Sequence, residues 1–168
     1  MYPEAKQTGL LSLVEKFHPR RIMNIGPAGL DVFGTYLKKN PDTHFDNFSD
    51  TRAVMKLDQA ERYDLCFISH VLEYMPKAEA EHLIARLRDV HCDKLNVVIP
   101  VGVGWSDLTC VWQSNEMLGL GFTRVGEFEY ENRTIHIYAF DIEHYKTTPD
   151  WLNSNYWANP DMFGKYWW

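Results

Sequence analysis

The chain has 168 residues, 45% of them hydrophobic and 24% charged, and its net charge is −6. This length and balance are typical of one soluble domain with a full hydrophobic core. The acidic balance disfavours a sequence-independent nucleic-acid binder, which needs a basic face against the phosphates. No apolar run approaches the ~18 residues of a membrane span, and no secretory leader is visible. The expectation is therefore a cytoplasmic protein with no nucleic-acid and no membrane partner.

Three isolated cysteines, Cys66, Cys92 and Cys110, lie far apart beside apolar residues. An odd number without framework spacing indicates reduced thiols, in keeping with a cytoplasmic location. The seven histidines show no metal-ligand spacing, and neighbouring residues such as His91 and Cys92 rarely converge on one ion. The sequence predicts no metal site.

The first part of the chain predicts a helix, a strand and a second helix. Apolar residues at helical spacing run from Leu10 to Phe17, and Pro19 ends that pattern. The apolar run at 22–25 predicts a buried strand that breaks into the turn Gly26-Pro27-Ala28-Gly29, and a helical pattern over 30–40 follows. A strand, a tight turn and a helix start form the junction where α/β proteins bind nucleotide-like ligands.

The rest of the chain continues with alternating strands and helices and closes with two strands. The predicted elements are a polar strand at 43–48, a helix at 51–62, a buried strand at 63–68, a helix at 77–91, a buried strand at 95–100, a helix at 106–120, and a hairpin of strands at 122–130 and 134–142. This order predicts an α/β fold of three layers, with a mostly parallel sheet and an antiparallel C-terminal hairpin.

The domain organisation is predicted as one α/β domain over 1–146, N-terminal helix included, followed by an aromatic-rich tail over 147–168. The tail's aromatic side chains are Trp151, Tyr156, Trp157, Phe163, Tyr166, Trp167 and Trp168. Large aromatic residues are costly to leave in water, so the tail must cover something. Packing on the protein's own sheet or N-terminal helix is the favoured interpretation. A lid over a ligand pocket comes second, and an anchor for a protein partner or a second copy in a homodimer comes third.

Three local patterns together resemble the class I S-adenosylmethionine-dependent methyltransferases. They are Asn24-Ile25-Gly26-Pro27-Ala28-Gly29 after a strand, Tyr63 to Pro76 as a buried strand with its following loop, and Met117-Leu118-Gly119-Leu120-Gly121-Phe122 before the hairpin. The resemblance spans about residues 20–143 and implies a Rossmann-like fold. With its tail, the whole chain also resembles a small uncharacterised bacterial family of methyltransferase-like proteins. A third strand is hard to find because 51–62 has a helical pattern, so the sequence leaves open whether one strand is missing.

The resemblance also implies where S-adenosylmethionine would bind. By position, the residues bordering it are Asn24, Gly26, Pro27, Ala28 and Gly29 in the first turn, Asp46 on the second strand, and Ser69 and His70 after the 63–68 strand. Asp46 lies about twenty residues beyond Gly26, a usual spacing for a carboxylate on the ribose, and Asp50 is the competing carboxylate. The motif is degenerate, because Asn24 stands where the family has an acidic residue, and Ala28 and Leu30 replace glycines.

His70 is the candidate for acid or base catalysis, because an unperturbed imidazole titrates near neutrality and would lie at the carboxyl end of a central strand. The alternative is a histidine packed under the following helix. Glu73 is expected to face solvent or to cap backbone amides.

Three functions are compatible with these patterns. The leading one is a methyltransferase acting on a small molecule or a protein. The second is a non-catalytic binding or scaffold protein of the same fold, whose tail contacts a partner. A dinucleotide-binding oxidoreductase is the weakest, because the terminal hairpin suits methyltransferases.

Overall fold

The structure is a computed structural model that describes residues 14–27, 29–49, 51–58, 62–102, 105, 107–130, 133–143 and 165. Residues 10–13 of the expected N-terminal helix and all of the predicted tail except Lys165 lie outside this part. Residues 14–17 are helical and the helix stops before Pro19, as the proline predicts.

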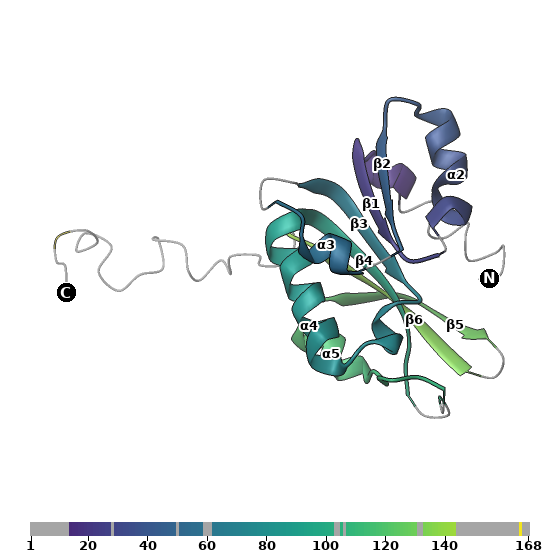
Figure 1. Cartoon of the computed structure of the whole chain (residues 1–168), viewed down its shortest axis with the longest axis vertical. Coiled ribbons are helices and arrows are strands. Elements are labelled where there is room, and N and C mark those ends of the chain that lie inside the picture. Colours follow the sequence, from purple (N-terminus) through teal and green to yellow (C-terminus); the bar gives the residue numbers. More distant parts are fainter. Residues whose placement is uncertain are drawn as a thin grey trace.

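A six-stranded sheet forms the middle layer, with the strand order β2-β1-β3-β4-β6-β5 (Figure 1). The strands are β1 (Arg21–Ile25), β2 (His44–Phe48), β3 (Tyr63–Ser69), β4 (Cys92–Pro100), β5 (Thr123–Tyr130) and β6 (Arg133–Asp141). The pairs β2–β1, β1–β3 and β3–β4 are parallel, and β6 pairs antiparallel with both β4 and β5. The predicted Rossmann-like fold with an antiparallel C-terminal pair is confirmed.

Helices cover both faces of this sheet because strands buried on both sides need two apolar partners. On one face, α2 (Gly29–Lys39) and residues 14–17 enclose a core with Phe33 and Phe67. On the other face, α3 (Thr51–Met55), α4 (Lys77–Arg86) and α5 (Ser114–Gly119) enclose a second core with Leu83 and Met117. Figure 1 shows α4 and α5 on the opposite side of the sheet from α2.

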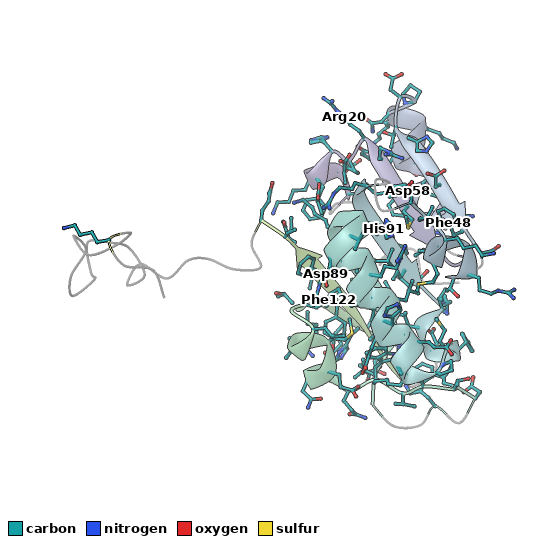
Figure 2. The ribbon with its side chains drawn as sticks, turned by 60° about the vertical axis from the view of Figure 1, so that its left-hand side comes forward. Arg20, Phe48, Asp58, Asp89, His91 and Phe122 are labelled. Atoms are coloured by element: carbon teal, nitrogen blue, oxygen red, sulfur yellow. The ribbon has the colours of Figure 1, made fainter. Side chains whose placement is uncertain are left out.

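The predicted helix at 77–91 is present, but its last turn is a π-helical turn, η2 (Leu87–His91). This turn leads directly into β4, which begins three residues earlier than the apolar pattern predicts, and Cys92 donates its thiol to the carbonyl of Leu87 at 3.2 Å. His91, the last residue of η2, is fully buried (labelled in Figure 2). All three cysteines are buried, and none of them forms a disulfide bond.

Two predicted helices are wrong in length. The helix expected at 51–62 ends at Met55, and residues 56–58 form a turn in which the amide of Leu57 donates to the carbonyl of Val54 at 3.2 Å. The helix expected at 106–120 is helical only over Ser114–Gly119. The described residues 107–113 before it are not helical. Among them, Trp112 forms a parallel β-bridge with Val101, which follows β4.

The strand that the resemblance would place between β2 and β3 in the chain is not among the six. In the described part of that segment, residues 51–58 hold α3 and its turn, and β2 is the outer strand of the sheet. None of the described helices combines the length and the apolar character that crossing a membrane requires.

The strand order places a switch point between β1 and β3. The chain leaves β1 toward β2 on one side and returns through β3 on the other. In open α/β sheets, ligands bind outside the carboxyl ends of the strands at such a point. A ligand site is therefore expected among the residues that follow β1 and β3.

Candidate active site

Gly26 brings the carboxyl ends of three strands together. Its backbone has φ of 117°, a conformation that side chains rarely adopt, and a Cβ there would overlap the carbonyl oxygen of Ser69 at the end of β3. Its amide donates to the carbonyl of Phe48, the last residue of β2, at 2.9 Å. The glycine is thus required by the close approach of strand ends, and its own amide is already used. Pro27 after it is exposed, and Ala28 lies outside the described residues.

Asn24 occupies the position where the class I methyltransferases that the chain resembles have an acidic residue. The hydrogen bonds of its side chain give a reason for this difference. Its side chain is fully buried, and Nδ2 donates to the carbonyl of Gly26 at 2.8 Å and to Oδ1 of Asn47 at 2.6 Å. A carboxylate has no proton to donate to either acceptor. Asn24 therefore stabilises the turn from within, and only its Oδ1 is left without a hydrogen-bond partner.

Ser69 presents a second buried polar atom without a partner. It is the last residue of β3, fully buried, and its Oγ makes no hydrogen bond to the described part of the chain. In the β1–β3 register Asn24 pairs with Phe67, so alternation along β3 puts Ser69 on the same face of the sheet as Asn24. Two buried oxygen atoms that lack partners thus flank the Gly26 turn at the switch point, and orphaned groups of this kind require an explanation.

His70 follows directly and has φ of 54°, an uncommon left-handed conformation for a residue with a side chain. The side chain is 35% exposed, and its Nδ1 lies 3.6 Å from Oε1 of Glu73. The imidazole is therefore partly buried beside the residues that follow β3. Glu73 lies in η1 (Leu72–Tyr74), and its side chain is only 3% exposed. The expectation that Glu73 faces solvent is therefore wrong, and its Oε2 has no hydrogen-bond partner among the described residues.

Two other ionisable groups near this edge have raised pKa values. Burial raises the pKa of the Tyr74 phenol, and the charges of Glu73 and Asp107 raise it further. Burial also raises the pKa of the Cys110 thiol; Lys77 opposes this shift, while carboxylates including that of Glu73 add to it. A raised pKa leaves less of either group deprotonated at neutral pH, and the role of His70 as an acid–base residue stays a prediction.

Asp46 lies on β2 but away from the Gly26 turn. It pairs with Met23 in the β1–β2 register, two positions before the end of the strand. Its Oδ2 accepts a hydrogen bond from the hydroxyl of Tyr63 at 2.7 Å and lies 2.8 Å from Nε2 of His44. The carboxylate thus binds side chains from the amino-terminal parts of β2 and β3, and its role toward a ribose stays a prediction. The alternative, Asp50, lies outside the described residues.

Residues 107–112 contribute to the same edge, which the helical interpretation of this segment missed. The amides of Thr109 and Cys110 both donate to the carbonyl of Glu73, each at 3.0 Å. The fully buried indole of Trp112 lies under Nζ of Lys77, 3.7 Å from the ring centroid. The segment is therefore tied to η1 and to the start of α4. The apolar spacing of Val111 and Trp112 alone does not distinguish this arrangement from a helix.

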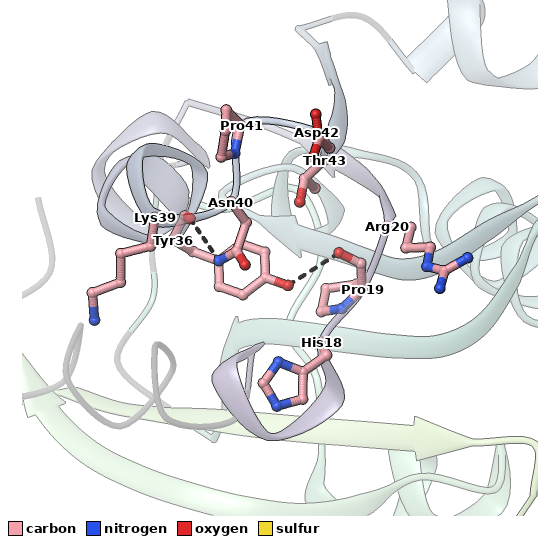
Figure 3. A pocket seen from close by; sticks show the side chains of 9 residues that line it. All are labelled: His18, Pro19, Arg20, Tyr36, Lys39, Asn40, Pro41, Asp42 and Thr43. Carbon is pink, nitrogen blue, oxygen red and sulfur yellow. Dashed lines mark hydrogen bonds between the residues drawn. The ribbon is translucent and has the colours of Figure 1, made fainter.

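A cavity of about 600 Å³ opens at the opposite, amino-terminal edge (Figure 3). Arg20, Asp42 and Thr43, which precede β1 and β2, line it together with the end of α2. Inside it, the hydroxyl of Tyr36 donates to the carbonyl of Pro19 at 3.1 Å. None of its lining side chains is among the described buried groups without a partner. It is thus distinct from the region around Gly26.

Comparison with known proteins assigns the chain to a family. A profile described as a family of unknown function, DUF6231, matches residues 4–168. The chain belongs to this family. No curated protein matches the sequence of this DUF6231 member.

Solved structures similar to this DUF6231 protein are methyltransferases. The 1,6-didemethyltoxoflavin-N1-methyltransferase of Burkholderia thailandensis, solved with S-adenosylhomocysteine, has a TM-score of 0.58 at 12% identity, covering 82% of this chain and 79% of that one. The methyltransferase domain of bacterial CtHen1 has a TM-score of 0.56 at 11% identity, covering 81% and 97%. Mitomycin 7-O-methyltransferase MmcR has a TM-score of 0.52 at 9% identity, covering 82% of this chain but 54% of its own. The DUF6231 chain has the class I methyltransferase fold.

Proposed function

We propose that this protein binds S-adenosylmethionine at the carboxyl edge between β1 and β3 and transfers its methyl group to a small molecule or a protein side chain. The observation that carries the proposal is the pair of buried, unpartnered oxygen atoms, Asn24 Oδ1 and Ser69 Oγ, beside the Gly26 turn. In a methyltransferase fold this is the edge where a nucleotide-like ligand is expected.

The residues present fit one part of this cofactor better than the other. Its methionine part carries an ammonium group, which needs acceptors, and Asn24 Oδ1 and Ser69 Oγ are acceptors without partners. Pro27 and Gly29, which follow Gly26 in the chain, are the further described residues proposed to border that part. At the ribose, the described residues offer Asp46, whose carboxylate already binds Tyr63. The fit is therefore to the methionine part.

The bound cofactor would supply an electrophilic methyl group. Methyl transfer is an in-line displacement, so the main task of the protein is to position the two reactants. The Gly26 turn, which the hydrogen bonds of Gly26 and Asn24 close, and the buried ends of β1 and β3 would form one wall of the site. His70 is the proposed acid–base group, because it follows β3 directly at this edge and its Nδ1 lies 3.6 Å from Oε1 of Glu73.

A non-catalytic binding protein of the same fold is the second candidate. This alternative is favoured because donors of the turn already form hydrogen bonds within the protein and are not available to a ligand. The amide of Gly26 donates to Phe48, and Nδ2 of Asn24 donates to Gly26 and Asn47. Such a turn is stable without a ligand. On this alternative the turn serves only to join the strands, and S-adenosylmethionine would not bind.

Thermal unfolding with and without S-adenosylmethionine tests the proposal. Ligand at about 100 times its dissociation constant stabilises the fold by about 2.7 kcal/mol. Ser69→Ala is the informative variant, because it removes a hydroxyl that makes no hydrogen bond in the protein. We expect it to keep or slightly raise the stability of the free protein and to reduce the ligand-induced shift. Thr123→Ala, which removes an exposed hydroxyl at the start of β5, is the matched control and should leave the shift unchanged. The absence of any shift at millimolar ligand would favour the scaffold alternative.

A further inference from the structure

Glu73 is a buried carboxylate held at the carboxyl edge of the sheet. Its backbone is fixed because its carbonyl accepts the amides of both Thr109 and Cys110. Its side chain is 3% exposed, Oε2 has no hydrogen-bond partner, and Oε1 lies 3.6 Å from Nδ1 of His70. A buried carboxylate is costly unless a positive charge or donors compensate it. The described ion pair of Glu73 is the one with His70.

The geometry of His70 indicates that its position is imposed. A non-glycine residue with φ of 54° is strained, and such strain persists only where the surroundings determine the conformation. Strained residues of this kind concentrate at functional sites. The separation of 3.6 Å is too long for a hydrogen bond. Catalytic pairs are often long in free proteins and shorten when ligands bind.

We propose that Glu73 is the positioning residue for His70: it holds the imidazole with its proton on Nδ1, so that Nε2 accepts a proton from the methyl acceptor. This inference rests on the proposed methyltransferase function and deepens it. An acceptor that must lose a proton is a hydroxyl or a phenol, because a neutral amine attacks through its lone pair before it loses a proton.

The step balances without a further reactant. The acceptor O–H proton passes to Nε2 of His70, and the acceptor oxygen forms a bond to the methyl carbon of S-adenosylmethionine. The carbon–sulfur bond breaks, and its electron pair stays on sulfur, giving the neutral thioether S-adenosylhomocysteine. The imidazolium, whose charge the Glu73 carboxylate stabilises, then releases its proton to water.

The surroundings of the pair favour a neutral aromatic acceptor. The neighbouring Tyr74 is acted on by the charges of Glu73 and Asp107, and Cys110 by Lys77 and by three carboxylates that include Glu73. Lys77 is already paired with Glu116 at 2.5 Å. The net acidic surroundings disfavour an anionic acceptor. The ring of Tyr74 is 54% exposed, and Val111, next to Cys110, is 37% exposed; they give the edge apolar surface for a ring. The acceptor class inferred is a neutral phenol.

The tautomer of His70 in the full-length protein without ligands tests the positioning role directly. Ring ¹⁵N chemical shifts, recorded at about pH 8.5 where an ordinary histidine is neutral, show which nitrogen carries the proton. We expect Nδ1–H in the wild type and mainly Nε2–H in Glu73→Leu. Glu73→Gln keeps an acceptor oxygen but removes the charge, so it should retain Nδ1–H. Glu79→Gln, an exposed carboxylate in the first turn of α4, is the control and should match the wild type. A wild-type ring with Nε2–H, or a tautomer unchanged in both Glu73 variants, overturns the positioning role.

The acceptor class is tested with p-cresol and p-toluidine, which have the same shape but carry a hydroxyl or an amine. We expect S-adenosylhomocysteine to form with p-cresol, and kcat to fall about 10- to 100-fold in Glu73→Gln with KM unchanged. This is less than the about 10²–10⁴-fold that general acid–base catalysis contributes, because the imidazole itself remains. S-adenosylmethionine that binds but is not turned over with p-cresol, or that reacts with p-toluidine alone, overturns the acceptor assignment while leaving the proposed cofactor binding intact. Failure of S-adenosylmethionine to bind overturns the proposed function, and the tautomer measurement still decides the role of Glu73.

Discussion

Replacing Gly26 with alanine tests whether the turn after β1 is held by close backbone contact. The added Cβ would overlap the carbonyl oxygen of Ser69, a backbone atom that cannot rotate away, and would lie 3.2 Å from Cγ2 of Val71. The backbone φ of 117° is itself strained for alanine, at about 1–3 kcal/mol. Displacing the strand ends would also weaken the hydrogen bond from Gly26 to Phe48, worth about 1 kcal/mol. We expect a loss of about 3–5 kcal/mol in the free energy of unfolding, a large share of the ~5–15 kcal/mol typical of a domain.

Urea unfolding followed by circular dichroism measures this loss, provided that the transition is two-state. Gly34→Ala is the matched control, because Gly34 lies within α2 and a Cβ there would meet nothing within 4 Å. In a helix interior, alanine is more stable than glycine by about 0.5–1 kcal/mol. The two Gly→Ala changes should therefore have opposite signs. A Gly26→Ala variant that loses less than about 1 kcal/mol, below the strain expected for this φ, would refute the close contact of the strand ends.

Three further predictions concern buried polar groups. Asn24→Asp removes the donor to Asn47 and buries a carboxylate, so the free energy of unfolding should fall by about 2–4 kcal/mol, and an equal or higher stability in urea contradicts the role given to Asn24. Burial lowers the pKa of His136 below 6.5; since the unfolded chain then binds more protons, stability should fall as the pH drops below about 6.5, and unfolding curves of His136→Gln should show a smaller fall. Burial raises the pKa of Glu116, but hydrogen bonds, first that of Lys77, outweigh burial and lower the pKa. The stability that this lowered pKa contributes is present above the ordinary value of 4.5 and is lost as the pH falls through the lowered value. Lys77→Met should therefore reduce the loss of stability at acid pH, measured as the free energy of unfolding in a pH series.

The strands could be predicted because each shows a simple apolar pattern. The continuous run from Tyr63 to Ile68 is buried on both faces of the sheet. The alternation of Ile135 and Ile137 with polar residues matches β6, whose residues pair with β4 on one side and β5 on the other. These patterns reflect the period of a strand and do not depend on distant residues.

The errors arose where distant contacts decide the local structure. Apolar residues around Trp112 have a spacing compatible with a helix. The chain is not helical there, because Trp112 forms a β-bridge with Val101 and its indole packs under Lys77. The burial of Glu73 depends on the 107–112 segment that folds onto its carbonyl. No local pattern reveals such a contact, and a charged residue is by default expected at the surface.

The candidate site was predicted in outline but not in its chemistry. Spacing located Gly26, Ser69 and His70 at the strand ends, where the structure places them. Spacing also selected Asp46, but it could not show that the carboxylate binds Tyr63 instead of facing the turn. Asn24 differs from the family motif for a reason visible only in the structure, which is that its amide donates two hydrogen bonds.

Calorimetric titration of the full chain with S-adenosylhomocysteine is the decisive test of cofactor binding, because it needs no methyl acceptor, and the Ser69→Ala variant tests whether the ligand lies at the carboxyl edge. We expect one ligand to bind per chain, with weaker binding in Ser69→Ala and unchanged binding in Thr123→Ala. A titration without heat of binding at millimolar ligand, in a wild-type protein shown to be folded, would contradict the account and leave a methyltransferase fold without its cofactor.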